Sequence, residues 1–218
     1  MVMKKSLLII SLFFIFLMGC ATRPPVREAL KEDIKIPAGK IEGNQFTGIR
    51  YPFNVSAPSP WKMTTEFPDF LGDLGYDKPS PEEKEQTELY IFNPETKSNI
   101  QFDFTPAGRY SIFSQESIEW LTTVATGSFK EELEKDYGKE VKADIGSTTA
   151  FSLKGVPFAA KKYATYTLKG VRREQGWIYG FSEPYQIFIL YMIMEKEGAD
   201  DRENLKRILD SFEVTSKK

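Results

Sequence analysis

The chain has 218 residues and nearly balanced charges, with 29 Lys and Arg against 31 Asp and Glu, and it contains one cysteine and no histidine. A mildly acidic chain lacks the basic surface by which proteins bind nucleic acids and anionic lipids, so we expect neither as the main partner. Without histidine it lacks the commonest metal ligand, and we expect no metal and no cofactor. A single cysteine cannot pair within the chain, so the folded part depends on its apolar core.

The first 19 residues are typical of a secretory signal peptide. Lys4 and Lys5 give a positive start, and an apolar run follows from Leu7 to Met18. This run is shorter than the roughly 20 residues that a helix needs to span a membrane, so we interpret it as a segment that is removed on export. Its removal takes two lysines and no acid, which leaves a net charge of about −4.

The tetrad Leu17-Met18-Gly19-Cys20 resembles the lipobox of bacterial lipoproteins, whose cysteine is acylated and becomes the first residue of the mature chain. The resemblance implies that Cys20 carries lipid, and at about 0.8 kcal/mol per buried methylene two or three acyl chains anchor a protein firmly. Ala21, and not aspartate, follows the cysteine, which by the sorting rule of that family implies the outer membrane, facing the periplasm, if the cell has two membranes. An ordinary secretory signal with a chance cysteine is the alternative.

Residues 20–45 are polar, contain three prolines and two glycines, and have no sustained hydrophobic period. We interpret them as a flexible tether, with a span of roughly 25–30 Å that lifts the domain off the membrane. The folded domain is predicted to comprise residues 46–218.

Extended segments are expected at 46–51 and 53–57, followed by a long loop over 62–86 that is rich in proline and glycine. Apolar alternation around 89–92 and 100–104 predicts an antiparallel hairpin. Ser114 is a suitable N-cap for a helix that continues to Gly138, with a kink or break at Gly127.

Four strands are predicted at 141–153, 157–168, 171–181 and 184–194. The last is apolar on both faces, which is typical of a strand in the middle of a covered sheet. Asp200 and Glu203 match a capping box that opens a closing helix. This order of elements predicts an α+β domain with a single antiparallel sheet flanked by helices.

Two segments carry a further resemblance: Tyr51–Trp61, a strand that ends in Pro-x-Trp, and Leu205–Phe212, a helix end that reads Ile-Leu-x-Ser-Phe. With the central hairpin and helix and the aromatic strand near Phe181, they resemble the PsbP-like superfamily, which includes the extrinsic PsbP proteins of photosystem II, a nuclear-import factor and bacterial lipoproteins. The resemblance implies an α/β/α sandwich that binds or supports assembly and is not an enzyme. Some members bind metal through histidine, a property that this chain cannot share.

Catalytic patterns are weak. Ser59-Pro60-Trp61-Lys62 matches the Ser-x-x-Lys pattern of penicillin-binding enzymes, but the prolines keep this stretch extended, whereas the chemistry needs Ser and Lys one helical turn apart. The acid pairs Asp200-Asp201 and Glu131-Glu132 are interpreted as helix capping and solvated helix surface. A carboxylate pair still leaves a glycan hydrolase as an alternative.

Two features are candidates for partner binding. Lys169, Arg172 and Arg173 lie where two predicted strands turn, and Trp177 and Tyr179 alternate onto one face of the second strand. Arginine and aromatic side chains are favoured anchors at interfaces, so this region could dock a protein or an anionic glycan. A solvated turn beside an aromatic row that packs beneath a helix is the competing interpretation.

From these patterns we predict a binding or assembly-accessory module without catalytic activity, anchored to a membrane through Cys20 on the extracytoplasmic side. The expected partner is another envelope protein. One alternative is a carrier whose aromatic core holds a small apolar ligand or lipid. The other alternative is a carboxylate-dependent hydrolase of cell-wall glycan.

Overall fold

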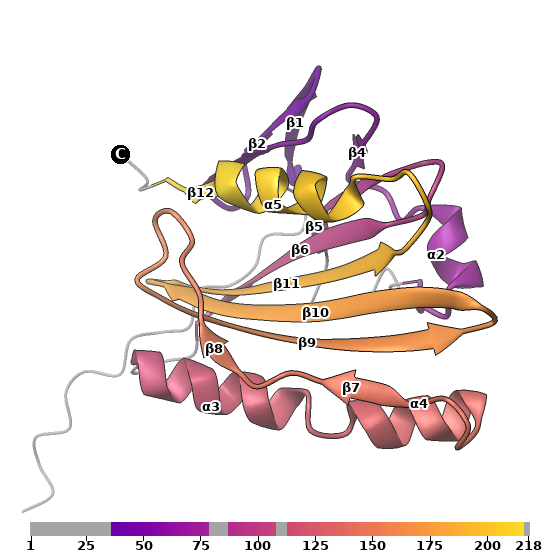
Figure 1. Cartoon of the computed structure of the whole chain (residues 1–218). Helices are drawn as coiled ribbons and strands as arrows, with labels where there is room; N and C mark the ends of the chain where they lie inside the picture. Colours follow the sequence, from indigo (N-terminus) through magenta and orange to yellow (C-terminus); the bar gives the residue numbers. More distant parts are fainter. Residues whose placement is uncertain (1–35, 79–86, 108–112, 216–218) are drawn as a thin grey trace, which may run out of the picture.

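The computed structural model describes residues 36–78, 87–107 and 113–215. The predicted signal peptide, Cys20 and the predicted tether as far as residue 35 lie outside the described residues. The described chain folds into layers around a long antiparallel sheet, with α5 and a small sheet on one side and α3 and α4 on the other (Figure 1). The predicted α+β class is confirmed, whereas the prediction of a single sheet is wrong, because the chain forms two sheets.

The small sheet joins the start of the described chain to its end. Its strands, in spatial order, are β1 (Gly39–Glu42), β2 (Gln45–Gly48), β3 (Phe53–Ser56) and β12 (Glu213–Val214). β1 lies inside the predicted tether, so the prediction that the fold begins at residue 46 is wrong. The strand was missed because it is short and mostly exposed, and it is held by pairing with β2 across a turn at Gly43, whose φ is +62°.

The large sheet has eight strands in the order β4-β5-β6-β11-β10-β9-β7, with β8 also paired to β9. They are β4 (Lys62–Thr64), β5 (Thr87–Phe92), β6 (Asn99–Pro106), β7 (Ala143–Ile145), β8 (Thr149–Ala150), β9 (Phe158–Leu168), β10 (Val171–Ser182) and β11 (Tyr185–Met194). The predicted hairpin is β5–β6, and the strand predicted at 141–153 is divided into β7 and β8. β11 lies between β6 and β10, which confirms its predicted central position.

The described helices are α2 (Asp69–Asp73), α3 (Gln115–Ala125), α4 (Phe129–Tyr137) and α5 (Asp201–Ser211). Ser114 caps α3, since its hydroxyl accepts from the Ser117 amide at 3.2 Å. The predicted break at Gly127 separates α3 from α4. The predicted capping box at Asp200 is wrong, because the Asp200 side chain makes no cap hydrogen bond. No helix among the described residues is long and apolar enough to cross a membrane.

The main core fills the space between the large sheet, the small sheet and α5. Phe53 stacks on Phe104 with ring centroids 4.6 Å apart, and Phe212 stacks on Phe102 at 5.5 Å. Each of these rings is fully buried, which stabilises the fold by roughly 1.5–3 kcal/mol per side chain. The aromatic richness of the sequence is therefore used for packing between the two sheets.

Gly176 of β10 is required by the packing on this side of the sheet. A Cβ at this position would overlap the ring of Tyr191, which is paired with Gly176 across the β10–β11 ladder. The missing side chain lets the Tyr191 ring lie directly over the strand, where it is fully buried. Tyr191 is thereby held in place, and its hydroxyl donates to the Glu174 carboxylate at 2.9 Å.

Candidate binding sites

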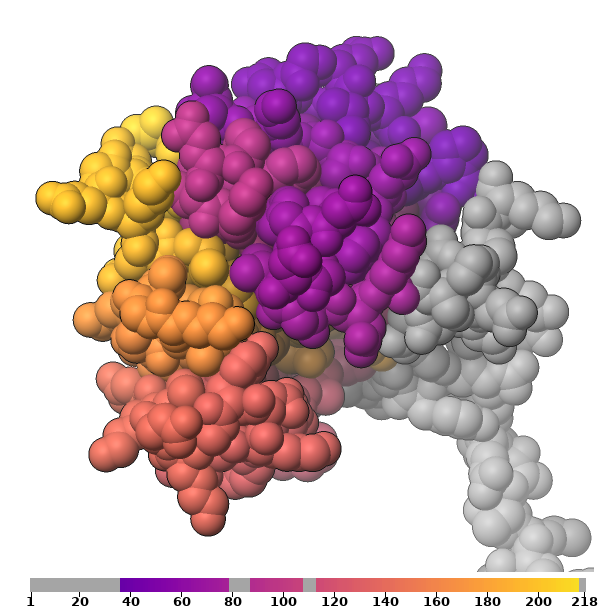
Figure 2. Space-filling model, turned by 90° about the vertical axis from the view of Figure 1, so that its right-hand side faces the viewer, coloured from indigo at the N-terminus to yellow at the C-terminus, as the bar shows by residue number. Residues whose placement is uncertain are grey.

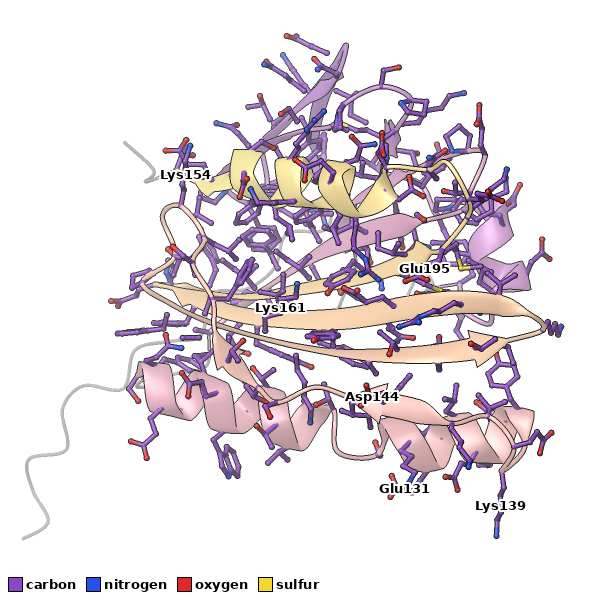
Figure 3. The ribbon with its side chains drawn as sticks, in the orientation of Figure 1. Glu131, Lys139, Asp144, Lys154, Lys161 and Glu195 are labelled. Carbon is purple, nitrogen blue, oxygen red and sulfur yellow. The ribbon has the colours of Figure 1, made fainter. Side chains whose placement is uncertain are left out.

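A network of charged side chains connects α5 to β10 and to the residue after β11. The Glu174 carboxylate accepts a hydrogen bond from the Tyr191 hydroxyl at 2.9 Å and pairs with Arg202 at 2.9 Å. Arg202 also contacts Glu195 at 2.7 Å, and Glu195 pairs with Arg172 at 3.5 Å. Figure 3 shows Glu195 close to the start of α5. Both oxygens of the buried Glu174 are engaged, so this network fastens α5 to the sheet.

Lys161 lies on the α5 side of β9 among aromatic rings. Its ammonium nitrogen is 5.0 Å from the ring centroid of Tyr191, 5.7 Å from that of Phe151 and 5.9 Å from that of Tyr163. Burial lowers the pKa of Lys161, and the negative charge of Glu174 opposes this shift. The ring faces supply favourable contacts for a cation that is partly removed from water.

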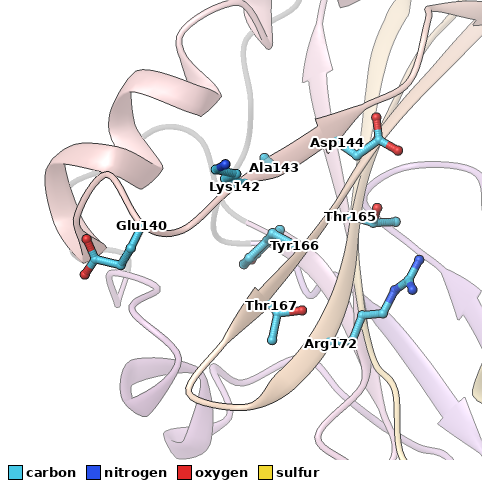
Figure 4. A pocket seen from close by; sticks show the side chains of 8 residues that line it. All are labelled: Glu140, Lys142, Ala143, Asp144, Thr165, Tyr166, Thr167 and Arg172. Carbon is cyan, nitrogen blue, oxygen red and sulfur yellow. The ribbon is translucent and has the colours of Figure 1, made fainter.

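A cavity of about 490 Å³ lies at the edge of the large sheet, where β7 pairs with β9. It is lined by Glu140, Lys142, Ala143, Asp144, Thr165, Tyr166, Thr167 and Arg172. Figure 4 shows Asp144 and Arg172 on one side of this edge and Lys142 and Tyr166 on the other. Because the lining contains acids and bases in equal number, no single sign of charge is concentrated there to select an ion.

The structure distributes the predicted basic cluster over two faces of the sheet. Lys169 lies in the β9–β10 turn, is exposed and has a left-handed backbone with φ of 51°. Arg172 points to the α5 side, where it pairs with Glu195. Arg173 points to the opposite side and is buried. Since successive side chains of a strand point to opposite faces, the two arginines cannot form one basic patch.

Trp177 and Tyr179 lie on the same face of β10 as Arg173. The Trp177 ring is buried and meets the ring of Phe129, at the start of α4, edge to face at 4.8 Å. Tyr179 packs on Phe188 of β11 at 4.7 Å. Trp177 is thus part of the packing beneath α4, and the aromatic row and the exposed part of the basic turn do not share a surface.

Tyr179 also lines a second cavity, of about 380 Å³, on this side of the sheet. The remaining lining residues are Thr87, Asp103, Thr105, Gln186, Ile187 and Phe188. A small ligand held here would meet both apolar rings and polar groups. The main aromatic core, in contrast, is filled by its own stacked rings. This packing does not favour the alternative of a carrier that holds a small apolar ligand or lipid in its aromatic core.

Arg173 is buried without a carboxylate partner among the described residues. Its exposed fraction is 8%, and its Nε atom has no hydrogen-bond partner. It lies between Tyr166 of β9 and Met194 of β11 in the strand register. Burial raises the pKa of Tyr166, while the charge of Arg173 and a hydrogen bond with it lower that pKa. Sequence reasoning placed Arg173 in an exposed turn and missed that it is enclosed.

Trp120 of α3 is the most exposed large apolar side chain among the described residues, with 66% of its surface accessible. Val124, one turn further on, is 54% exposed. On the opposite side of the helix Ile118 and Thr122 are buried against the sheet. Trp120 was not among the predicted site residues. Because it follows Ile118 by two positions, it lies about 200° around the helix from that buried residue and points away from the core.

The Ser-x-x-Lys pattern has no catalytic geometry. Ser59 precedes β4, and Lys62 is the first residue of that strand, so no helix aligns the two side chains. No group of three or more His, Cys, Asp or Glu residues within the described ranges could hold a metal ion.

The acid pairs that left a hydrolase open are not gathered in a cleft. The Asp201 carboxylate is buried and accepts a hydrogen bond from the Asn93 amide at 2.8 Å, which ties α5 to the β5–β6 turn. Glu131 and Glu132 are exposed on α4, and Glu131 points away from the sheet (Figure 3). The solvated-surface interpretation therefore holds for Glu131 and Glu132, whereas the capping interpretation of Asp200 and Asp201 is wrong, because Asp200 makes no cap hydrogen bond and Asp201 ties α5 to the β5–β6 turn.

The described architecture is the fold of the PsbP-like proteins, as the sequence resemblance predicted. Cyanobacterial PsbP (CyanoP) from Synechocystis sp. PCC 6803 superposes with a TM-score of 0.51 at 10% sequence identity, over 82% of this chain and 99% of that chain. LpqN, involved in cell envelope biogenesis of Mycobacterium tuberculosis, gives a TM-score of 0.44 at 11% identity, over 76% and 84% of the two chains. No family model and no curated protein matches the sequence. At such identities the likeness defines the fold and transfers no site residue.

Proposed function

We propose that the protein is a lipid-anchored, extracytoplasmic accessory module that docks on another envelope protein and performs no catalysis. The observation that carries this proposal is the exposed pair Trp120 and Val124 on a helix whose other face is fixed to the sheet. Tryptophan is the side chain most enriched among residues that dominate binding energy, and it is rarely left in water.

The surroundings of Trp120 indicate the chemistry of the partner. Helix α3 contains two acids, Glu116 and Glu119, and no lysine or arginine. An anionic membrane surface would be repelled by such a helix, whereas a basic protein surface with an apolar recess would complement it. The helix is also preorganised, because the Gln115 amide donates to the Ala159 carbonyl of β9 at 2.9 Å and buried Thr122 lies on its inner face.

The membrane anchor rests on the sequence alone. The lipobox at Cys20 supports acylation, and the segment after it then lets the folded domain reach a partner in the same membrane. Mass spectrometry of the purified mature protein should find acyl chains on Cys20 as the first residue. A mature chain that begins elsewhere, or that carries no acyl chain on Cys20, would contradict lipid anchoring.

The docking proposal is tested by crosslinking and co-purification of the lipidated protein from membranes, compared with Trp120→Ala. Truncation of an interface anchor should weaken binding by about 2 kcal/mol, or roughly thirtyfold in Kd, and higher salt should weaken it further. Tyr163→Ala is the matched control, because Tyr163 is an exposed aromatic residue (43%) on the opposite side of the large sheet. Equal capture of the same protein by both variants would overturn the assignment of the surface.

A further inference from the structure

Arg173 is a permanently charged side chain that is enclosed in the protein. A guanidinium group keeps its proton throughout the accessible pH range, so it cannot escape burial by becoming neutral. Removing an unpaired charge from water destabilises a protein by several kcal/mol. Within the described part of the chain no acid forms an ion pair with Arg173, and its Nε–H has no acceptor.

The same chain neutralises its other enclosed arginine. Arg50 is equally buried and lies 3.0 Å from the carboxylate of Glu88. Arg202, although half exposed, contacts two carboxylates. The absence of a carboxylate beside Arg173 is therefore a departure from the pattern that this protein follows elsewhere.

A second unpartnered donor lies close to the first. The hydroxyl of Tyr76, in the segment after α2, is buried and has no hydrogen-bond partner. Tyr166 and Arg173 are among the groups that act electrostatically on Tyr76, as is Tyr137 at the end of α4. The Tyr166 hydroxyl already donates to the Gln175 side chain at 3.1 Å, so its own proton is not available to a bound anion.

We propose that Arg173 and Tyr76 bind an oxyanion, the carboxylate or phosphate group of a small molecule, between β10 and the segment that follows α2. The planar fork of arginine matches two oxygens of such a group, and the Tyr76 hydroxyl supplies a further donor. Tyr166 is paired with Arg173 in the strand register. It also lines the cavity where β7 pairs with β9, and this cavity provides an approach from solvent. Figure 2 looks onto this end of the molecule, where the α2 segment, the β9–β10 turn and α4 come together.

The test is thermal unfolding of the full mature protein in phosphate, sulfate or acetate, with chloride at matched ionic strength as the reference. A specific site predicts a saturable rise in Tm of about 2–4 °C with at least one oxyanion, which identifies its class. Arg173→Met should abolish the rise, and Tyr76→Phe should weaken the binding about tenfold. Arg207→Met removes an exposed arginine of α5, on the other side of the sheet, and should leave the response unchanged.

Two results would overturn the inference. One is a wild-type protein that responds to no oxyanion beyond the effect of chloride, and the second is an undiminished response in Arg173→Met. If Arg173→Met does not fold, Arg173→Lys and Tyr76→Phe test the same point, since lysine keeps the charge without the planar fork and phenylalanine keeps the ring without the hydroxyl.

Discussion

On its α5 side the large sheet is covered by one continuous core of stacked aromatic and aliphatic side chains, whereas on its α3–α4 side the described apolar cluster is small. The larger core includes Phe53, Phe102 and Phe212, and the smaller one consists of Leu133, Tyr166 and Leu168 with a few partly buried neighbours. Buried Arg173 and the exposed Trp120 both belong to the second side. One face of the sheet therefore supplies most of the stability, so the other face can hold polar groups that lack hydrogen-bond partners within the protein.

The largest expected effect comes from opening the α5-side core. Phe212→Ala removes a fully buried ring that lies against Phe53, Phe102 and Phe104. The resulting cavity should lower the free energy of unfolding by about 3–5 kcal/mol, measured by urea denaturation. A loss below about 1 kcal/mol would show that this core is not the main source of stability.

A smaller loss is expected from the matched change on the other side. Leu133→Ala removes a buried side chain of α4 that packs on Tyr166 and Leu168. We expect the free energy of unfolding to fall by about 2–3 kcal/mol, at the lower end for such truncations, because the small cluster can relax around the gap. Hydrogen exchange should show faster opening of α4 than of α5. If Leu133→Ala destabilised the protein more than Phe212→Ala, the proposed division between the two faces would be wrong.

The smallest effect, and one that depends on pH, concerns Lys161 on the α5 side. Burial lowers its pKa below the ordinary value of 10.5, so the folded state binds this proton less tightly than the unfolded state. Between the folded and the unfolded pKa the unfolded chain carries more protons, and stability from this group rises with pH. Lys161→Met should therefore stabilise the protein most near neutral pH, and its advantage should shrink as the pH approaches 10.5.

Denaturation at several pH values between 7 and 10 measures this difference. Glu174, Arg202, Tyr163 and Tyr191 face the amine and remain in both proteins, so their titration cancels in the comparison. Lys161→Arg is the control, since arginine keeps its charge over this range. A Lys161→Met advantage that grows with pH would contradict the assigned direction of the shift.

Much of the fold could be predicted because its signals are local. Alternation identified the β5–β6 hairpin, a doubly apolar run identified β11 as central, and Ser114 and Gly127 marked the start of α3 and the break before α4. β1 has no such signal, since its residues are mostly exposed and only its pairing with β2 makes it a strand. The small sheet is completed by β12, which pairs with β3 from the far end of the chain, a contact that no local pattern predicts.

Less of the candidate sites could be predicted from the sequence. Arg172 and Arg173 are adjacent in the chain and were expected to act together, yet strand alternation places them on opposite faces, one in solvent and one enclosed. The signal for Trp120 was present, as its angle from Ile118 on the helix shows, but it required the knowledge of which face of α3 meets the sheet.

The sequence by itself determined the element types and the α+β class, because periodicity and caps depend on neighbouring residues, and its resemblance to the lipobox gave the expectation of a lipid-modified Cys20. Only the tertiary structure decided that Trp120 remains in water and that the Nε of Arg173 and the hydroxyl of Tyr76 are enclosed without hydrogen-bond partners. Burial and charge compensation depend on segments that are far apart in the chain. An unpaired charge destabilises the folded protein only when those segments exclude water from it, so neighbouring residues cannot reveal it.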